Sequence, residues 1–310
     1  MTSNKIITSV EGHIVALAWS LWAELGVSGW TRDHRDVAID PEALVLLTAW
    51  LRDLDPRLRD EATDWCVRYG RVVSAARLKN LLVSARWLHS EWWAEFAGTV
   101  NANSRWKWPA PDAQPRDFVA SRKSRIEDFT PASLIYLRVR AFVGLGARAE
   151  IIRLLASQPH SRWGVAQTAS QIGYSKRNTA EALDGLEMAG LLSSLRVRNR
   201  LEYMVIDAAR HGALVDPRPR WTPEWVPILS VITRVVEFLR RAEDLPESVA
   251  SVECVTVVRG MNEELALWGL PPPQLVMVEE PAYQRFARWA SELLAGLAVG
   301  DQKLLAGRQS

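Results

Sequence analysis

The stretch VAQTASQIGYSKRNTAEALDGLEMAGLL, residues 165–192, decides the fold of this chain. Its apolar spacing predicts a short helix over residues 165–172 and a longer helix over residues 176–189. Ala169 supplies the small side chain that two closely crossing helices need. Gly173, four residues later, allows a turn with positive φ. We therefore expect two helices joined by a tight turn.

The residues around this helix pair extend it into a larger unit. Ser175 is placed to cap the second helix and Gly190 to end it. Apolar spacing over residues 148–157 predicts a preceding helix, followed by a polar turn over residues 159–164. Beyond Gly190 a basic tip separates two short apolar runs, which predicts a β-hairpin. The runs hold Leu195 and Val197 on one strand, and Leu201, Tyr203 and Val205 on the other.

The order of these elements over residues 147–206 resembles the winged helix-turn-helix superfamily, in a pattern close to the MarR and ArsR type regulators. The chain also resembles a larger, mostly uncharacterised bacterial family of winged-helix proteins, starting at TPASLIYLRVRAFVGLGARAEIIRLLAS, residues 130–157. This resemblance implies a DNA-binding core inside an extended helical protein. It does not imply a particular effector.

In such a module the second helix enters the major groove of duplex DNA, so its first turn carries candidate contacts. The residues of that turn are Ser175, Lys176, Arg177, Asn178 and Thr179. Arg177 is suited to a bidentate contact with guanine, and Asn178 can bind adenine in the same way. The acidic residues of this helix lie further along it and are not expected to cancel the basic first turn.

Two further groups of residues are candidate DNA contacts. Gln167 and Thr168 in the first helix of the pair could contact phosphates. Arg196, Arg198 and Arg200 alternate along the hairpin, which predicts one basic face directed at a minor groove or the backbone.

The charge distribution agrees with this interpretation better than the net charge does. The chain has 310 residues and a formal net charge of only +2, which excludes a uniformly basic nucleic-acid coat. Residues 105–220, however, hold 19 basic and 11 acidic side chains, a net charge of +8. Residues 1–104 and 221–310 together carry −6. A local basic region of this kind is typical of a phosphate-facing surface, and a chance distribution of solvated charges is the alternative.

The predicted fold class is mainly α, with helical bundle segments on both sides of a central winged helix-turn-helix that carries a small β-hairpin wing. The expected domains are an N-terminal helical domain over residues 1–104, a Pro-rich basic linker over 105–131, the winged module over 132–206, and a C-terminal helical domain over 207–310 for dimerisation or sensing.

Three predicted helices make up most of the C-terminal segment. Residues 224–241 and 281–297 have strong helical period, and these two helices are the preferred candidates for a homodimer interface. Residues 247–268 contain many valines that favour a strand, but the helical pattern that follows favours one long helix ending at Gly269.

Five tryptophans lie within 22 residues, namely Trp87, Trp92, Trp93, Trp106 and Trp108. Their spacing fits helical packing, so we expect most of them in the core; a base-stacking platform or a cation–π cage is the alternative. Residues 116–125 form either a basic arm along phosphates or a solvated linker. The helix pair around Gly70 could be a second helix-turn-helix, although its spacing favours a helical bundle.

The sequence does not indicate an enzyme, a cofactor or a metal site. It has no glycine-rich phosphate loop, nucleophile elbow or HExxH motif, so no catalytic residue is assigned. Cys66 and Cys254 have no Cys or His partner at metal-ligand spacing, and Asp33, His34 and Asp36 fit a surface loop better than a metal cluster.

These patterns predict a cytoplasmic, sequence-specific DNA-binding transcriptional regulator of bacterial type. Its expected partner is double-stranded DNA, bound as a homodimer because one winged module reads only a few base pairs. A small-molecule or protein effector is open. No membrane partner is expected, because the apolar stretch 14–23 is too short to span a bilayer. The alternative is a protein-interaction subunit, such as an antitoxin-like partner of an enzyme, in which the winged module docks a protein or binds its own operator.

Overall fold

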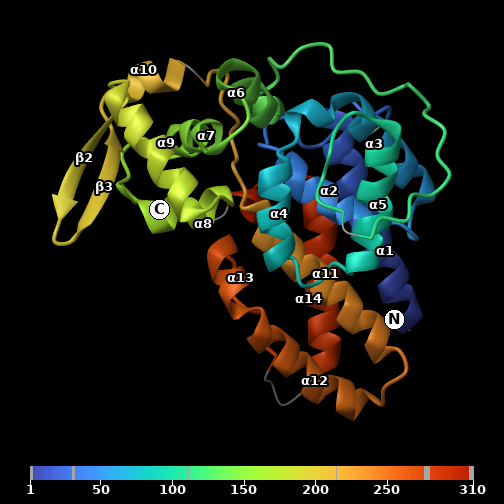
Figure 1. The fold of residues 1–310 in the computed structure, drawn as a ribbon. Coiled ribbons are helices and arrows are strands. Elements are labelled where there is room, and N and C mark those ends of the chain that lie inside the picture. Colours follow the sequence, from blue (N-terminus) through green and yellow to red (C-terminus); the bar gives the residue numbers. More distant parts are fainter. Residues whose placement is uncertain (1–2, 30–31, 111, 214, 276–279, 307–310) are drawn as a thin grey trace.

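The computed structural model describes residues 3–29, 32–110, 112–213, 215–275 and 280–306 (Figure 1). Helices make up 61% of the chain, and the strands of the described residues form one small antiparallel sheet. The predicted mainly α class with a β-hairpin is therefore confirmed.

Helices from the two ends of the chain form what we call the helical body. The N-terminal group consists of α1 (Ser3–Glu24), α2 (Pro41–Trp50), α3 (Pro56–Tyr69), the 3-10 helix η1 (Gly70–Val72), α4 (Ala75–Ser84) and α5 (Ser90–Asn103). The C-terminal group consists of α11 (Trp225–Ala242), α12 (Glu247–Gly260), α13 (Asn262–Trp268), α14 (Ala282–Ala298) and α15 (Gln302–Leu305).

One hydrophobic core joins the two groups of helices. α1 packs along α14 and α11, so Leu17 and Leu21 share a core with Ile232, Phe286 and Leu294 (Figure 1). All five side chains are almost completely buried. The helices within residues 3–103 and 225–305 therefore share one core, whereas the sequence suggested a separate domain at each end.

The apolar side chains of α11 and α14 are buried in this core. Residues along the full length of α11 are buried, from Ile228 to Leu239, and α14 buries Phe286, Ala290 and Leu297 in the same way. The regularly spaced apolar residues that made these helices dimer candidates therefore pack against other helices of the same chain. Their buried stripes are not available to a second copy.

The segment 247–268 is helical, as expected, but it is broken into α12 and α13 at Met261. The break lies beside Gly260, where a Cβ atom would approach the Nη2 atom of Arg234 to 2.6 Å. That guanidinium forms an ion pair with Glu264 at 3.0 Å. Gly269 then ends α13 in a left-handed conformation with φ of 83°, as the sequence predicted.

Residues 104–110 and 112–131 have no regular secondary structure, but they do not form a free linker. They run over the N-terminal helices as a strap (Figure 1). The backbone N–H of Arg125 donates to the carbonyl of Gly26 at 2.7 Å, and that of Arg122 donates to Asp64 at 2.9 Å. Arg68 donates to the carbonyl of Ser124 at 2.9 Å. The strap is therefore part of the helical body.

The tryptophan cluster belongs to the core, as its spacing predicted. Trp87, Trp93 and Trp108 are buried, and Trp92 and Trp106 are partly buried against the same core. Two indoles attach the strap to the helices. Trp93 donates to the carbonyl of Pro109 at 2.6 Å, and Trp106 donates to that of Val67 at 3.0 Å. The helix pair around Gly70 likewise lies in the bundle.

The remaining elements form what we call the central module. They are η2 (Ala132–Leu134), α6 (Ile135–Val143), α7 (Ala147–Ser157), β1 (Trp163–Gly164), α8 (Val165–Ile172), α9 (Lys176–Met188), β2 (Leu192–Val197), β3 (Arg200–Val205) and α10 (Ala208–Ala213). A second hydrophobic core lies here, with Ile151, Leu155, Ile172, Leu183 and Tyr203 at its centre.

The sheet of the central module has the strand order β1-β3-β2. β2 and β3 form the predicted hairpin, with Val197 opposite Arg200 next to the turn. β1 was not expected from the sequence. It pairs antiparallel with β3 through Trp163 opposite Tyr203, and its two residues are too few to show a strand pattern. The order of elements from α7 is thus helix, strand, helix, turn, helix and hairpin.

Candidate nucleic-acid interface

The turn between α8 and α9 has the structure that its residues predict. Gly173 has φ of 70°, and the backbone N–H groups of Gly173 and Tyr174 both donate to the carbonyl of Ala169. Ser175 caps α9, because its hydroxyl accepts from the backbone N–H of Asn178 at 3.2 Å. The first turn of α9 is therefore held in a defined position.

That first turn presents four of its five predicted contacts to solvent. Ser175, Lys176, Arg177 and Asn178 are exposed. Thr179 is completely buried, and its hydroxyl donates to the carbonyl of Ser175 at 2.9 Å. It lies on the inner side of the helix and supports the turn. The assignment of Thr179 as a surface contact is therefore corrected.

The two candidate phosphate contacts of α8 differ in the same way. Gln167 is exposed, but Thr168 is completely buried and donates its hydroxyl to the carbonyl of Gly164 at 3.0 Å. Neighbouring positions of a helix differ by about 100° around its axis, so both cannot face the same surface. Gln167 stays a candidate contact, and Thr168 becomes a residue of the interior.

The three arginines of the hairpin are exposed, but they do not form one face. Cross-strand partners share a face of the sheet. Arg196 is opposite Leu201 and Arg200 is opposite Val197, so Arg196 and Arg200 lie on opposite faces. Arg198 occupies the turn, with φ of 56°. The predicted single basic face is wrong because the chain reverses between Arg196 and Arg200, and the tip is basic on both sides.

The acidic residues of α9 bind groups within the module. Asp184 accepts a hydrogen bond from the Tyr203 hydroxyl at 2.6 Å, and Glu187 accepts one from the backbone N–H of Ser194 at 2.8 Å. Both contacts brace the hairpin against α9. Glu181 forms an exposed ion pair with Arg177 at 3.0 Å, which is a weak interaction in water.

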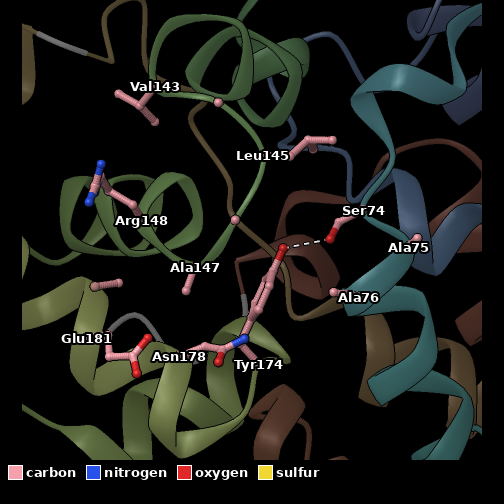
Figure 2. Close-up of a pocket in the computed structure, with 13 residues that line it drawn as sticks. Ser74, Ala75, Ala76, Val143, Leu145, Ala147, Arg148, Tyr174, Asn178 and Glu181 are labelled. Atoms are coloured by element: carbon pink, nitrogen blue, oxygen red, sulfur yellow. Dashed lines mark hydrogen bonds between the residues drawn. The ribbon is translucent and has the colours of Figure 1, made fainter.

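The helical body clamps the turn that precedes α9. Arg77 of α4 donates its Nε–H to the carbonyl of Ile172 at 2.9 Å, and Asn80 donates to that of Gly173 at 3.0 Å. The hydroxyls of Ser74 and Tyr174 are hydrogen-bonded at 2.7 Å, as Figure 2 shows. These three contacts fix the orientation of α9 relative to the helical body.

A buried network of charges lies directly behind this clamp. It consists of the acids Asp40, Glu42 and Glu150 and the arginines Arg77, Arg140 and Arg153. Each of the six residues is less than 9% exposed. Arg77 and Arg140 both donate to Glu42 at 2.7 Å, and Arg140 also donates to Glu150 at 2.8 Å. The network thus connects α2 and α4 of the body to α6 and α7 of the central module.

The arginines keep the buried acids ionised. Burial alone would raise the pKa of Asp40, but the charge of Arg77 and its hydrogen bonds lower that pKa below the ordinary 3.8. Burial likewise opposes ionisation of Glu150, and the charges of Arg140 and Arg153 lower its pKa below the ordinary 4.5. Asp40 also caps α2 by accepting from the backbone N–H of Glu42 at 3.1 Å.

This network shows that part of the positive charge counted in the central segment is not on the surface. Arg140 and Arg153 contribute to the charge of +8 over residues 105–220, but both lie in the interior beside acids. The basic groups that reach solvent around α9 are fewer than the sequence count suggests. The network residues were missed as interacting groups. One signal was available, because Glu42 is the single charge in the otherwise apolar helix α2.

A hollow of about 580 Å³ opens beside the first turn of α9. Figure 2 shows it between Ala75 and Ala76 of α4, Leu145 of the α6–α7 loop, and Asn178 and Glu181 of α9. Tyr174 forms its inner wall with its hydroxyl on Ser74. One side of the candidate DNA-reading turn therefore faces open space.

Among the residues that the structure describes, no group of three or more His, Cys, Asp or Glu side chains is arranged to hold a metal ion. The absence of a metal site stays a prediction. Asp33 and Asp36 lie exposed in a loop, as expected, but the ring of His34 between them is completely buried. It contacts the Ser20 hydroxyl at 2.8 Å and the carbonyl of Leu297 at 3.0 Å.

One described helix, over residues Lys5–Glu24 of α1, is long and apolar enough to cross a membrane by length and composition. Half of the apolar window is buried inside the protein. The expectation of no membrane partner and a cytoplasmic location stays a prediction.

Comparisons with protein-family models, with curated proteins and with solved structures find no match for this chain. The resemblance to winged helix-turn-helix regulators therefore stays a prediction from the sequence.

Proposed function

We propose that the chain binds duplex DNA through the central module, in the manner of a winged helix-turn-helix, and acts as a sequence-specific transcriptional regulator. The order of elements carries this proposal: helix α7, strand β1, helix α8, a tight turn, helix α9 and the hairpin β2–β3. An exposed first turn of α9 lies next to a hairpin with a basic tip. This arrangement suits a helix in the major groove with a wing on the neighbouring backbone.

The exposed residues divide the work of recognition. Arg177 and Asn178 are the candidates for reading bases, because a guanidinium can bind guanine and a carboxamide can bind adenine in bidentate fashion. To bind a base, Arg177 must first break its ion pair with Glu181. This costs little free energy, because that ion pair is solvent-exposed. Ser175, Lys176 and Gln167 are placed for phosphate contacts.

The wing contributes charge on both of its faces. Arg198 at the turn is flanked by Arg196 on one face and Arg200 on the other. A tip of this kind can lie in a minor groove with phosphates on either side. We assign these arginines to affinity and the residues of α9 to sequence specificity.

A charge-matched pair of variants tests the proposal. The test variant carries Arg177→Ala, Arg196→Ala and Arg198→Ala; the control carries Arg35→Ala, Arg86→Ala and Arg259→Ala, three exposed positions outside the central module. Random-site selection supplies the DNA, and binding is measured against salt concentration. We expect the test variant to lose about 100-fold or more in affinity and about 2–3 units of salt slope. The control variant should keep most of the wild-type affinity and most of the wild-type salt slope.

Two outcomes would overturn this function. One is wild-type protein with no salt-dependent affinity for any selected duplex. The other is a test variant and a control variant that bind DNA equally well. Thr179→Val is a further check, because that hydroxyl is assigned to the interior and its removal should leave sequence preference unchanged.

Recognition of a symmetric operator requires a homodimer, which we include in the proposal because one module covers only a few base pairs. Its interface lies outside the buried stripes of α11 and α14. Sedimentation analysis with and without the selected duplex measures the oligomeric state. A palindromic selected site bound by two chains is the expected result.

A protein partner on the same face is the second candidate, and exposed apolar side chains favour it. Met188 at the end of α9 is 90% exposed, and Leu195 and Leu201 of the hairpin are 49% and 40% exposed. An antitoxin-like subunit would dock its partner through such residues. Met188→Ser with Leu195→Ser separates the two functions, because these changes should leave DNA affinity intact and weaken a protein complex.

A further inference from the structure

A cavity of about 650 Å³ lies between the central module and the helical body. The module lines it with Arg153 of α7, Trp163 of β1 and Gln171 of α8, and the body lines it with Glu224 and with Trp268 of α13. Ligand sites for small molecules commonly measure about 300–1,000 Å³. This cavity is separate from the hollow beside α9, because the two share no lining residue.

The lining of the cavity mixes polar side chains with a group of buried aromatic and apolar ones. Trp163 and Trp268 are each 2% exposed, and Ile135 and Ala156 lie beside them. The indole nitrogen of Trp163 has no hydrogen-bond partner among the described residues. Buried indole N–H groups usually find a partner, so an unpaired one next to a cavity is unusual. This surface suits a flat apolar group.

The charges around the cavity are mainly positive. Its described lining holds Arg153, Arg218 and Arg220 but a single acid, Glu224. Arg218 and Arg220 are exposed at the rim, whereas Arg153 is buried. Burial raises the pKa of the Glu224 carboxyl, and the charge of Arg153 opposes that shift. Gln171 also donates to Glu224, at 2.8 and 3.0 Å once its amide is oriented to satisfy both groups.

Arg153 is the group best placed to bind an anion. Its Nε donates to Glu150 at 3.3 Å, and its guanidinium lies 4.1 Å from the centre of the Tyr136 ring. Neither terminal nitrogen forms a hydrogen bond with another described residue. A guanidinium whose two terminal nitrogens are free matches the two oxygens of a carboxylate or phosphate.

We propose that this cavity binds a small organic anion. Its carboxylate or phosphate group contacts Arg153 and the two rim arginines, and its flat apolar part packs against Trp163 and Trp268. The binding of this ligand does not depend on the proposed DNA function.

Regulation by such a ligand does rest on the proposed function. Gln167, a candidate phosphate contact, lies on the rim of the same cavity. The walls belong to both the central module and the helical body, so a ligand that contacts both shifts their relative position or holds it fixed. We therefore expect the anion to change the affinity of the chain for its selected DNA.

The experiment uses the full chain with three probes: 2-naphthoate, the neutral 2-naphthamide, and inorganic phosphate. Calorimetry and tryptophan fluorescence measure binding. The test variants are Arg218→Gln with Arg220→Gln, and Trp163→Phe; the control is Arg86→Gln with Arg259→Gln, which removes the same charge elsewhere. Circular dichroism confirms that each variant is folded.

We expect one 2-naphthoate per chain, bound about tenfold or more tighter than 2-naphthamide and than phosphate. The double rim variant and Trp163→Phe should each weaken 2-naphthoate by about tenfold, and the control should not. Absence of saturable binding, equal affinity for the acid and the amide, or a rim variant that matches the control would overturn the proposal. If phosphate binds as tightly as 2-naphthoate, the claim that the ligand carries a flat apolar group is overturned.

A DNA-binding measurement separates this proposal from the earlier one. If 2-naphthoate binds as expected but no duplex binds at any salt concentration, the ligand site stands and the DNA function fails. If selected DNA binds and 2-naphthoate does not, the DNA function stands and the cavity proposal fails.

Discussion

Glu42 and Glu150 show how single residues hold the helical body and the central module together. Each is an acid that is 1% exposed or less, and each accepts from two arginines. Removing charges from water is costly, so such a network stabilises little more than an apolar contact would. Losing one member is different, because it leaves the opposite charges buried without a partner.

Glu150→Gln is therefore expected to destabilise the chain by about 3–5 kcal/mol at neutral pH, measured by urea unfolding. The same side chain gives a pH test. The pKa of Glu150 is lowered in the folded protein, so its contribution is present above the ordinary 4.5 and is lost as the pH falls through the folded pKa. The difference between wild type and variant should shrink in acid.

Glu91→Gln is the matched control, because Glu91 is exposed in the first turn of α5. Its effect should stay within about 0.5 kcal/mol, as for most surface changes. Equal destabilisation by the two substitutions, or a Glu150→Gln effect that does not change with pH, would contradict the role assigned to the network.

At the scale of elements, α4 is the part that connects the α8–α9 turn to the helical body. The turn itself follows from local sequence, since Gly173 has the positive φ that its position requires. Its orientation does not follow from local sequence. Arg77 and Asn80 of α4 bind the carbonyls of Ile172 and Gly173, residues that are more than 90 positions away along the chain.

Gly173→Ala should weaken both the turn and this clamp. A Cβ atom there would lie 3.2 Å from Leu81 and 3.3 Å from the Nε of Arg77, and the left-handed φ adds a cost of about 1–2 kcal/mol. Thermal unfolding measures the effect. Gly12→Ala in α1 is the control: its Cβ would have no heavy atom within 4 Å, so it should stabilise the chain by about 0.5–1 kcal/mol. Two substitutions of the same sign would refute this explanation.

At the scale of the whole molecule, the two ends of the chain fold together around one core. α1 packs on α14 and α11, and the strap over residues 104–131 closes the N-terminal side (Figure 1). The chain passes from this body into the central module and then back into the body. The charge network and the contacts of Ser74, Arg77 and Asn80 with the α8–α9 turn hold the module in place. Helix α9, held in this way, moves with the body.

A shortened chain of residues 1–206 is therefore expected to be unfolded, even though it contains the complete helix-turn-helix and hairpin. It would expose Leu17, Leu21 and the rest of the α1 face, which is buried against helices that the fragment lacks. Near-ultraviolet circular dichroism and urea titration measure the loss. Cooperative unfolding of the fragment at the midpoint of the intact chain would show that the N-terminal segment is an independent domain.

The sequence by itself determined the local structure. The bounds of α8, the cap at Ser175, the turn at Gly173 and the position of the hairpin follow from spacing and from residues that act on near neighbours. The tryptophan core was predictable for the same reason. Tertiary structure alone decided which helices share a core and which arginines are buried with acids. It also decided that Thr168 and Thr179 point inward and that the hairpin arginines lie on both faces of the sheet. These features depend on contacts and strand register between residues far apart in the chain, and neither composition nor helical period records them.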